Sequence, residues 1–233
     1  MRKPFGASLS ARAMDSIGCV RQKIHEIIAK SKVPEDPGHS RNTLDWLLRL
    51  EPDADEALRI AALGHDIERA LEEQKVCQAD FTDFSAFKSA HALNSAQILK
   101  EVMSGCGTPD GLAEDVCRLV RCHETGGDPR SDLLKDADSL SFFEVNLPLY
   151  FQRHTQEETL QRCLWGLSER GAQPLAQKRH PEYKAGRLGN YKPRVALNYL
   201  FSYYPMDMAD VGFFWRVVGP VVADLFAAFF ALR

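Results

Sequence analysis

The stretch Ala61-Ala62-Leu63-Gly64-His65-Asp66-Ile67-Glu68-Arg69 places a histidine and an aspartate at the end of an apolar helical run. A neutral imidazole nitrogen and an anionic carboxylate on adjacent residues can hold one divalent metal from two sides. The dipeptide alone does not distinguish a ligand from a core histidine bonded to a carbonyl. Further side chains of the same kinds, at His39, His91, His123 and Asp138, lie at or beside other apolar runs. We therefore interpret the stretch as part of a metal site.

Length and composition describe an ordinary globular protein. The chain has 233 residues, of which 45% are hydrophobic and 26% charged, enough for one well-buried core. The formal net charge of −3 provides no basic surface for nucleic acid. We expect a single-core protein with no obligate nucleic-acid partner.

Apolar residues recur every three or four positions through the first two thirds of the chain, which is typical of amphipathic helices. The expected helices run from about Leu9 to Ile28, from His39 through Leu48, from near Pro52 through His65, from about Asp83 to Met103, from near Pro109 to His123, and through Asp138 to before Pro148. In the third, fifth and sixth of these, a histidine or aspartate shares the apolar face. An aspartate on such a face is costly unless it is paired or binds a metal. The sequence predicts an all-α fold with these polar side chains facing inward.

The order His39, His65-Asp66, His91, His123, Asp138 resembles the HD superfamily of metal-dependent phosphohydrolases. The resemblance covers roughly residues 30–150 and implies a single HD-type helical bundle. It implies that His39, His65, Asp66 and Asp138 bind a first metal, and that His91 and His123 occupy the places of the extra histidines of two-metal members. The phrase Cys122-His123-Glu124-Thr125-Gly126-Gly127 is similar to the His-Glu turn of such members.

The implied activity is hydrolysis of a phosphomonoester or phosphodiester, of a nucleotide or small metabolite, by a metal-activated water. Imidazole and carboxylate ligands suit one or two ions of Mn, Fe, Co, Ni or Zn, and such an ion lowers the pKa of bound water. We expect Asp66 to bridge the metals and orient the nucleophile, and Lys88 and Arg69 to neutralise the phosphoryl group of a small substrate.

Two departures and two alternatives accompany this reading. Some nucleotide-hydrolysing members carry a glutamate three residues after the aspartate, where this chain has Arg69; Glu68 is adjacent but, on a continuing helix, points elsewhere. The interval from His123 to Asp138 is also shorter than in many two-metal relatives. The same order of ligands resembles di-iron oxygenases on this scaffold, and a non-catalytic metal-binding regulatory module is the third possibility.

We expect an N-terminal helix (1–30), the HD-type metal-binding domain (31–155) and a helical C-terminal extension (156–233) that packs on the same core. Residues 178–194 are basic with interspersed tyrosines, either a solvated surface or a lid that attracts a phosphorylated substrate. Residues 211–232 are very apolar but interrupted by Arg216, Gly219-Pro220 and Asp224, so we expect no membrane span. This segment either packs on its own domain or forms a homodimer interface, and we predict the homodimer.

The six cysteines lack any Cys-x-x-Cys pair, and their spacing does not form a zinc ribbon or a disulfide scaffold. They are Cys19, Cys77, Cys106, Cys117, Cys122 and Cys163. We expect them to be reduced thiols in a cytoplasmic protein.

Overall fold

The computed structural model describes residues 6–155 and residue 158, and this part of the chain is helical, with no strand. The prediction of an all-α fold is confirmed. The elements are α1 (Gly6–Ile28), α2 (Asp36–Leu50), α3 (Glu56–Gly64), the 3-10 turns η1 (Ile67–Ala70) and η2 (Gln78–Asp80), α4 (Phe84–Gly105), α5 (Asp110–Cys122), α6 (Pro129–Ser141), the π-helical turn η3 (Phe142–Asn146) and α7 (Leu147–Arg153).

The chain forms two compact units, residues 1–146 and residues 147–233. All the predicted metal ligands belong to the first unit. The basic segment 178–194, the apolar segment 211–232 and the homodimer predicted through it lie outside the described residues. Within the described part, no helix is long and apolar enough to cross a membrane.

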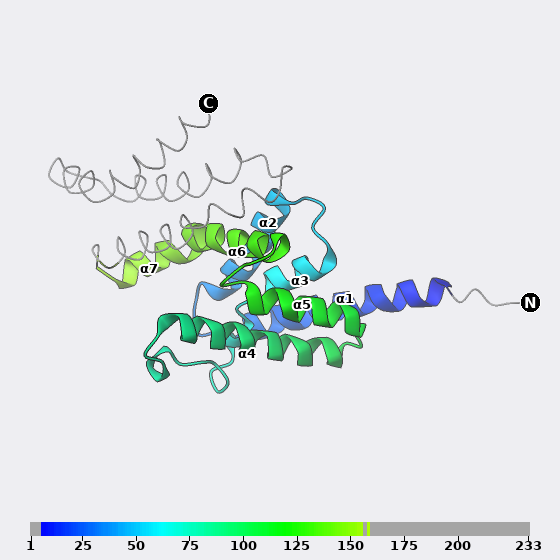
Figure 1. Ribbon diagram of the computed structural model, residues 1–233, viewed down its shortest axis with the longest axis horizontal. Helices are drawn as coiled ribbons and strands as arrows, with labels where there is room; N and C mark the ends of the chain where they lie inside the picture. Colours follow the sequence, from blue (N-terminus) through cyan, green and yellow to red (C-terminus); the bar gives the residue numbers. More distant parts are fainter. Residues whose placement is uncertain (1–5, 156–157, 159–233) are drawn as a thin grey trace, which may run out of the picture. The chain divides into compact units, whose positions relative to one another are not determined.

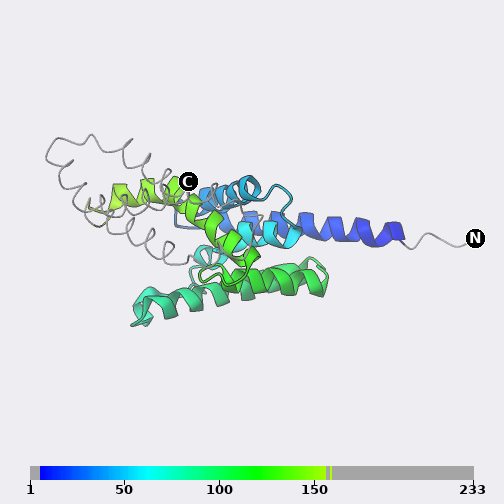
Figure 2. The ribbon, with the colours of Figure 1, turned by 45° about the horizontal axis from the view of Figure 1, so that its top comes forward.

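Helix pairs bring distant parts of the first unit together (Figure 1). Helices α4 and α5 pack along each other, and α2 packs against α6, while α3 contacts both α2 and α5. Figure 2 shows α5 lying along α4 from a second direction. Each helix contributes a fully buried side chain to the core: Ile24, Leu47, Ile60, Leu99, Leu119 and Leu134 from α1 to α6. The core therefore fixes the helix ends from which the site is built.

Three of these helices begin at an aspartate that caps the first turn. The carboxylate of Asp55 accepts a hydrogen bond from the amide of Leu58, and Asp83 and Asp128 cap α4 and α6 in the same way. Such a cap satisfies amides that have no partner within the helix. The acid-rich start predicted for the third helix is thus a capping signal at Asp55.

The histidine-aspartate pair lies in a break between helices. We expected one helix to continue from Leu58 through His65 to Arg69, but α3 ends at Gly64 and η1 begins at Ile67. Asp66 adopts φ −105° and ψ 16°, the sparsely populated bridge region where active-site residues are often found. The expectation of a continuing helix is therefore wrong here, and the side-chain directions inferred from it change.

Gly64 explains why α3 can end so close to α4. A Cβ atom at this position would lie 2.6 Å from Cδ2 of Leu99, well inside van der Waals contact. Glycine therefore allows the end of α3 to pack directly against the side chain of Leu99 in α4, immediately before His65. The sequence uses the smallest residue where the two ligand-bearing helices approach.

The prediction that all cysteines are reduced thiols is wrong for one pair. Cys19 in α1 and Cys106, directly after α4, form a disulfide with their Cα atoms 5.8 Å apart. The two residues are 87 positions apart in the chain, so local spacing could not pair them. Cys77, Cys117 and Cys122 are free thiols, and Cys163 lies outside the described residues.

Candidate metal centre

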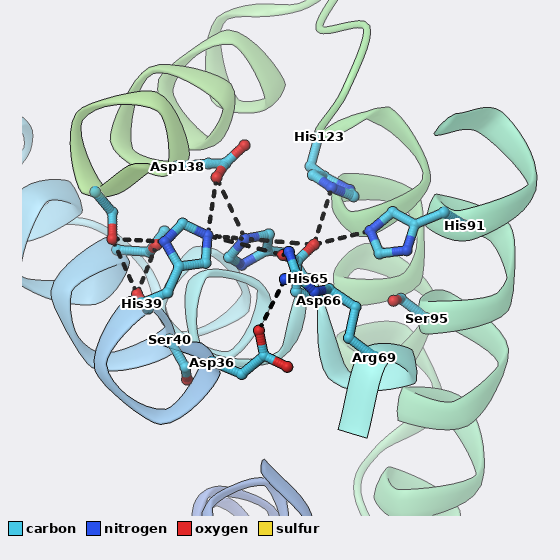
Figure 3. Close-up of polar contacts among 12 residues, drawn as sticks. Asp36, His39, Ser40, His65, Asp66, Arg69, His91, Ser95, His123 and Asp138 are labelled. Atoms are coloured by element: carbon cyan, nitrogen blue, oxygen red, sulfur yellow. Dashed lines mark hydrogen bonds and ion pairs between the residues drawn. The ribbon is translucent and has the colours of Figure 1, made fainter. Parts of the chain in front are cut away.

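The six predicted ligands come from five places in the first unit and lie close together (Figure 3). His39 lies in the first turn of α2, His65 and Asp66 follow α3, His91 lies in α4, His123 follows α5, and Asp138 lies in α6. They form two groups, each able to hold a metal ion: His39, His65 and Asp138, and Asp66, His91 and His123. We call these the first position and the second position.

The first position is compact. Nε2 of His39 lies 3.1 Å from Oδ1 of Asp138 and 3.2 Å from Nε2 of His65. The same carboxylate oxygen lies 3.5 Å from Nε2 of His65. Two imidazole nitrogens and one carboxylate oxygen therefore point at a single small volume, as three ligands of one ion would.

The second position shares Asp66 with the first. Oδ1 of Asp66 lies 2.8 Å from Nε2 of His91 and 3.7 Å from Nε2 of His123. It is also 3.7 Å from Nε2 of His65, while Oδ2 lies 3.8 Å from Nε2 of His39. Figure 3 shows Asp66 between His39 and His91. Its carboxylate is therefore placed to contact ions at both positions.

The four imidazoles are all held through Nδ1. His39 pairs with the hydroxyl of Ser141, which itself donates to the carbonyl of His39, so Nδ1 of His39 is the donor. Nδ1 of His65 and of His123 lie 3.0 and 2.7 Å from carbonyl oxygens three residues earlier, and Nδ1 of His91 lies 2.6 Å from a carboxylate oxygen of Glu68. These acceptors require a proton on Nδ1. In the neutral form of each ring, Nε2 then carries an inward-facing lone pair, the form in which imidazole binds a metal.

One ligand atom, Nε2 of His123, is buried without a hydrogen bond within the described part of the chain. Buried polar atoms are rarely left without a partner, because the loss of hydration is costly. With its Nδ1 committed to the Val120 carbonyl, this nitrogen fits a metal ligand. The residues present therefore fit a divalent transition metal.

The pKa values of the ligand side chains show that the site favours positive charge. Burial alone would lower the pKa of His65 and His91, but the carboxylates of Asp66 and its neighbours raise these values to about 9 and about 10. Burial would raise the pKa of Asp66 and Asp138, yet the surrounding imidazoles hold both well below the ordinary range. Burial lowers the pKa of His123. The site thus favours positively charged, protonated imidazoles beside two ionised carboxylates. A bound metal ion would supply the same positive charge.

The aspartates form the more accessible side of the site. The side chains of His39, His65, His91 and His123 are at most 7% exposed, whereas those of Asp66 and Asp138 are 16% and 13% exposed. The imidazoles therefore form the floor of the site. Asp66 and Asp138 are the ligands with the most solvent contact.

The two cations predicted to bind substrate lie next to the site, and each has a carboxylate partner. Arg69 forms ion pairs with Oδ2 of Asp66 at 3.2 Å and with Oδ1 of Asp36 at 3.1 Å. Lys88 forms an ion pair with Glu124, whose other oxygen lies 3.7 Å from Nε2 of His123. Arg69 is thus tied to the shared carboxylate, and Lys88 to the edge of the second position.

Four supporting residues were not predicted from the sequence. They are Asp36, Glu68, Glu124 and Ser141, which contact Arg69, His91, Lys88 and His39 in turn. Asp36 is buried, and burial raises its pKa against the opposing effect of Arg69. The expectation that Glu68 points away from the site is wrong, because η1 replaces the expected helix. The only sequence signal for any of the four was Glu124, within the His-Glu phrase.

Comparison with known proteins identifies a family but no characterised relative. The model of the family described as Domain of unknown function (DUF4202) matches residues 12–185. No curated protein and no solved structure matches the chain. The match covers the whole candidate centre.

Proposed function

Because the chain belongs to the DUF4202 family, whose description assigns no activity, we propose its function from the site itself. The protein is a metal-dependent phosphohydrolase of the HD type, acting on a small phosphorylated substrate. His39, His65 and Asp138 bind the first ion, His91 and His123 bind the second, and Asp66 binds both. Mn, Fe, Co, Ni and Zn are the ions that this set of imidazoles and carboxylates suits.

The observation that supports this proposal most directly is the placement of Asp66. Its two carboxylate oxygens face different imidazoles, with Oδ2 toward His39 and Oδ1 toward His91 and His123. Arg69 pairs with Oδ2 alone, so it does not account for the imidazoles that face Oδ1. A carboxylate directed at two separate groups of imidazoles is the arrangement that a two-ion centre requires.

Two ions at these positions would supply a water of lowered pKa and polarise the oxygens of a phosphoryl group. The chain's own residues provide the rest. Arg69 holds Asp66 in place through Oδ2, and the buried carboxylate of Asp36 holds Arg69 from the other side. This chain of contacts fixes the shared ligand, so that its orientation is set before substrate binds.

The cations also define the class of substrate. The side chains of Arg69 and Lys88 are one third and one fifth exposed. Arg69 pairs directly with the ligand Asp66, and Lys88 pairs with Glu124, which lies beside the ligand His123. A phosphoryl oxygen could share the guanidinium of Arg69 with Asp36, or replace Glu124 at Lys88. The proposal therefore assigns positioning to Asp66 and phosphoryl binding to Arg69 and Lys88.

A di-iron oxygenase is the second candidate, and the ligand set itself favours it equally. Four imidazoles and two carboxylates are ligands that iron accepts. The two activities differ in what they consume, because hydrolysis needs water alone and the oxygenase needs dioxygen. The cations beside the site favour the hydrolase, since an anionic phosphoryl group complements them.

The test is a screen of phosphorylated nucleotides and metabolites for phosphate release, with and without oxygen, on protein loaded with each of the five metals. We expect release that needs metal and does not need oxygen. Asp66→Ala should reduce the rate of phosphate release by at least about 100-fold. Loss of a residue that only hydrogen-bonds to a ligand typically costs about 10–100-fold, and loss of the ligand itself should cost more. The control is Asp45→Ala, an exposed aspartate of α2, which should retain activity.

Near wild-type turnover by Asp66→Ala, with helix content unchanged, would contradict the proposal. Oxygen-dependent turnover with no phosphate release would favour the oxygenase.

A further inference from the structure

Among the four imidazole ligands, only His91 donates from Nδ1 to a carboxylate within the described part of the chain. Nδ1 of His91 donates to Oε1 of Glu68 at 2.6 Å, whereas the other three rings donate to backbone carbonyls or to a hydroxyl. Glu68 is 2% exposed, so this contact is shielded from solvent. A carboxylate on the far nitrogen of a ligating imidazole fixes its tautomer and raises its basicity.

The second oxygen of Glu68 is bound to a different part of the chain. Oε2 accepts hydrogen bonds from the backbone amide of Val76 at 2.6 Å and from the side-chain amide of Asn94 at 3.1 Å. Asn94 also donates to the carbonyl of Gln74 at 2.6 Å. Residues 72–83, which connect η1 to α4, are mostly exposed. Glu68 therefore joins this exposed segment to a ligand of the second position.

The other side of Glu68 is fixed by the helix that carries His91. The backbone amide of Glu68 faces the hydroxyl of Ser95, which lies one turn after His91 in α4 and is labelled in Figure 3. His91 and Asn94 lie in the same helix. Three contacts from α4 thus set the position of Glu68, and a further contact to its carboxylate comes from Val76 in the segment.

We infer that Glu68 is the positioning residue of the second metal position, and that it couples occupancy of that position to the conformation of residues 72–83. The inference rests on the proposed two-ion site. With an ion at the second position, His91 would be fixed through Nε2, its Nδ1–H would hold Glu68 in place, and the bond from Glu68 to the amide of Val76 would thereby be stabilised. At the first position, the Nδ1 partners of the two histidines in the described part of the chain are instead Ser141 and the Ala62 carbonyl, which lie outside residues 72–83.

The first test counts ions and measures their affinities separately by titrating chelator-treated full-length protein with Mn²⁺. The wild-type chain should bind two ions. Glu68→Gln keeps the size of the side chain but removes its charge, and it should weaken the second ion by about 10–100-fold while leaving the first unchanged. The control is Glu73→Gln, the same change at an exposed position of the same segment, which should bind both ions as wild type.

The second test measures hydrogen exchange of the segment as Mn²⁺ is added. Binding of the second ion should slow exchange at Val76 and its neighbours in the wild-type chain, and this effect should be absent in Glu68→Gln. A role confined to folding stability would weaken both ions together and would leave no ion-dependent change in this segment.

Asn94→Ala covers the case in which Glu68→Gln does not fold. It removes one tie between Glu68 and the segment but keeps the carboxylate on His91, so the second ion should weaken by a smaller factor than in Glu68→Gln. The inference is overturned if wild-type protein binds fewer than two ions, if Glu68→Gln weakens both ions equally, or if Asn94→Ala leaves both ion binding and exchange unchanged. A chain that binds two ions as described but releases no phosphate contradicts the proposed activity and leaves this inference standing.

Discussion

The two metal positions use the same kinds of ligand but are supported differently. At the first position His65 donates to a carbonyl of its own helix, and His39 to a hydroxyl that donates back to its own carbonyl. At the second position His91 depends on Glu68, whose contacts reach an exposed segment. The histidines of the first position are therefore held by contacts within and between the helices, whereas the second position also depends on the conformation of residues 72–83.

Asp66 contacts histidines of both positions. Its Oδ1 faces His91 and His123 of the second position and also lies 3.7 Å from Nε2 of His65, while its Oδ2 faces His39 and Arg69. A substitution on one side of this carboxylate should therefore change mainly the affinity for one of the two ions. Variants that affect only one side can therefore separate the two positions.

The largest expected effect comes from removing one imidazole from each position. His65→Gln should eliminate the first ion and His123→Gln the second, and each should reduce phosphate release by at least about 100-fold, because a lost ligand costs more than a lost supporting partner. Elemental analysis of each variant should find one ion per chain fewer than in wild type. Loss of both ions in either variant would show that the two positions do not bind independently.

The junction of the two positions can be disturbed at Gly64. Gly64→Ala should place its Cβ against the side chain of Leu99, so that this buried side chain or the end of α3 must shift, destabilising the fold by about 1–3 kcal/mol. For a chain of this length the melting temperature should fall by roughly 2–4 °C for each kcal/mol. Gly111→Ala in α5, where an added Cβ meets nothing within 4 Å, is the control and should leave stability unchanged or slightly raised. Equal melting temperatures for the two variants would contradict the close approach.

A smaller change separates the first position from the second. Ser141→Ala removes the acceptor of Nδ1 of His39 and should weaken the first ion by roughly 10-fold, the low end for a ligand's supporting partner, with the second ion unaffected. The measurement is the same Mn²⁺ titration that is used for Glu68→Gln. The two variants should give opposite patterns, and identical patterns would remove the distinction between the positions.

The smallest expected effect is a pH dependence of stability in chelator-treated protein. The pKa values of His65 and His91 are raised to about 9 and about 10 from an ordinary value near 6.5, so protonation of these residues stabilises the fold. This contribution is complete below about pH 6.5 and is lost as pH rises through 9 and 10. The melting temperature should therefore fall over that range. Metal-loaded protein should show less change, because its imidazoles bind the ion unprotonated, and equal pH profiles would contradict this cause.

The ligands could be predicted from the sequence because each one ends or interrupts an apolar helical pattern. His123 follows a regular stripe in α5, and Asp138 lies in α6 beside buried leucines, so packing of the helices brings them together. Their order along the chain added the resemblance to the HD superfamily. The structure places all six predicted ligands in the two groups.

The supporting residues could not be predicted because they depend on breaks in the helices and on long-range packing. Glu68 faces His91 only because α3 stops at Gly64, a stop that the apolar periodicity did not indicate. The hydroxyl of Ser141 reaches His39 across 102 positions, and the disulfide joins cysteines 87 positions apart. The pairing of Arg69 with Asp36 has the same origin. Local patterns predict which face a residue lies on, but not which distant side chain will meet it.

The most direct test of a metal-dependent phosphohydrolase counts bound ions and released phosphate on the same sample. Chelator-treated protein is supplied with increasing Mn²⁺, and each fraction is analysed for ions per chain and for turnover of the best substrate from the screen. We expect two ions per chain, with turnover absent in ion-free protein and greatest when both positions are filled. Turnover that persists without ions, or protein that refuses Mn, Fe, Co, Ni and Zn alike, would contradict the account.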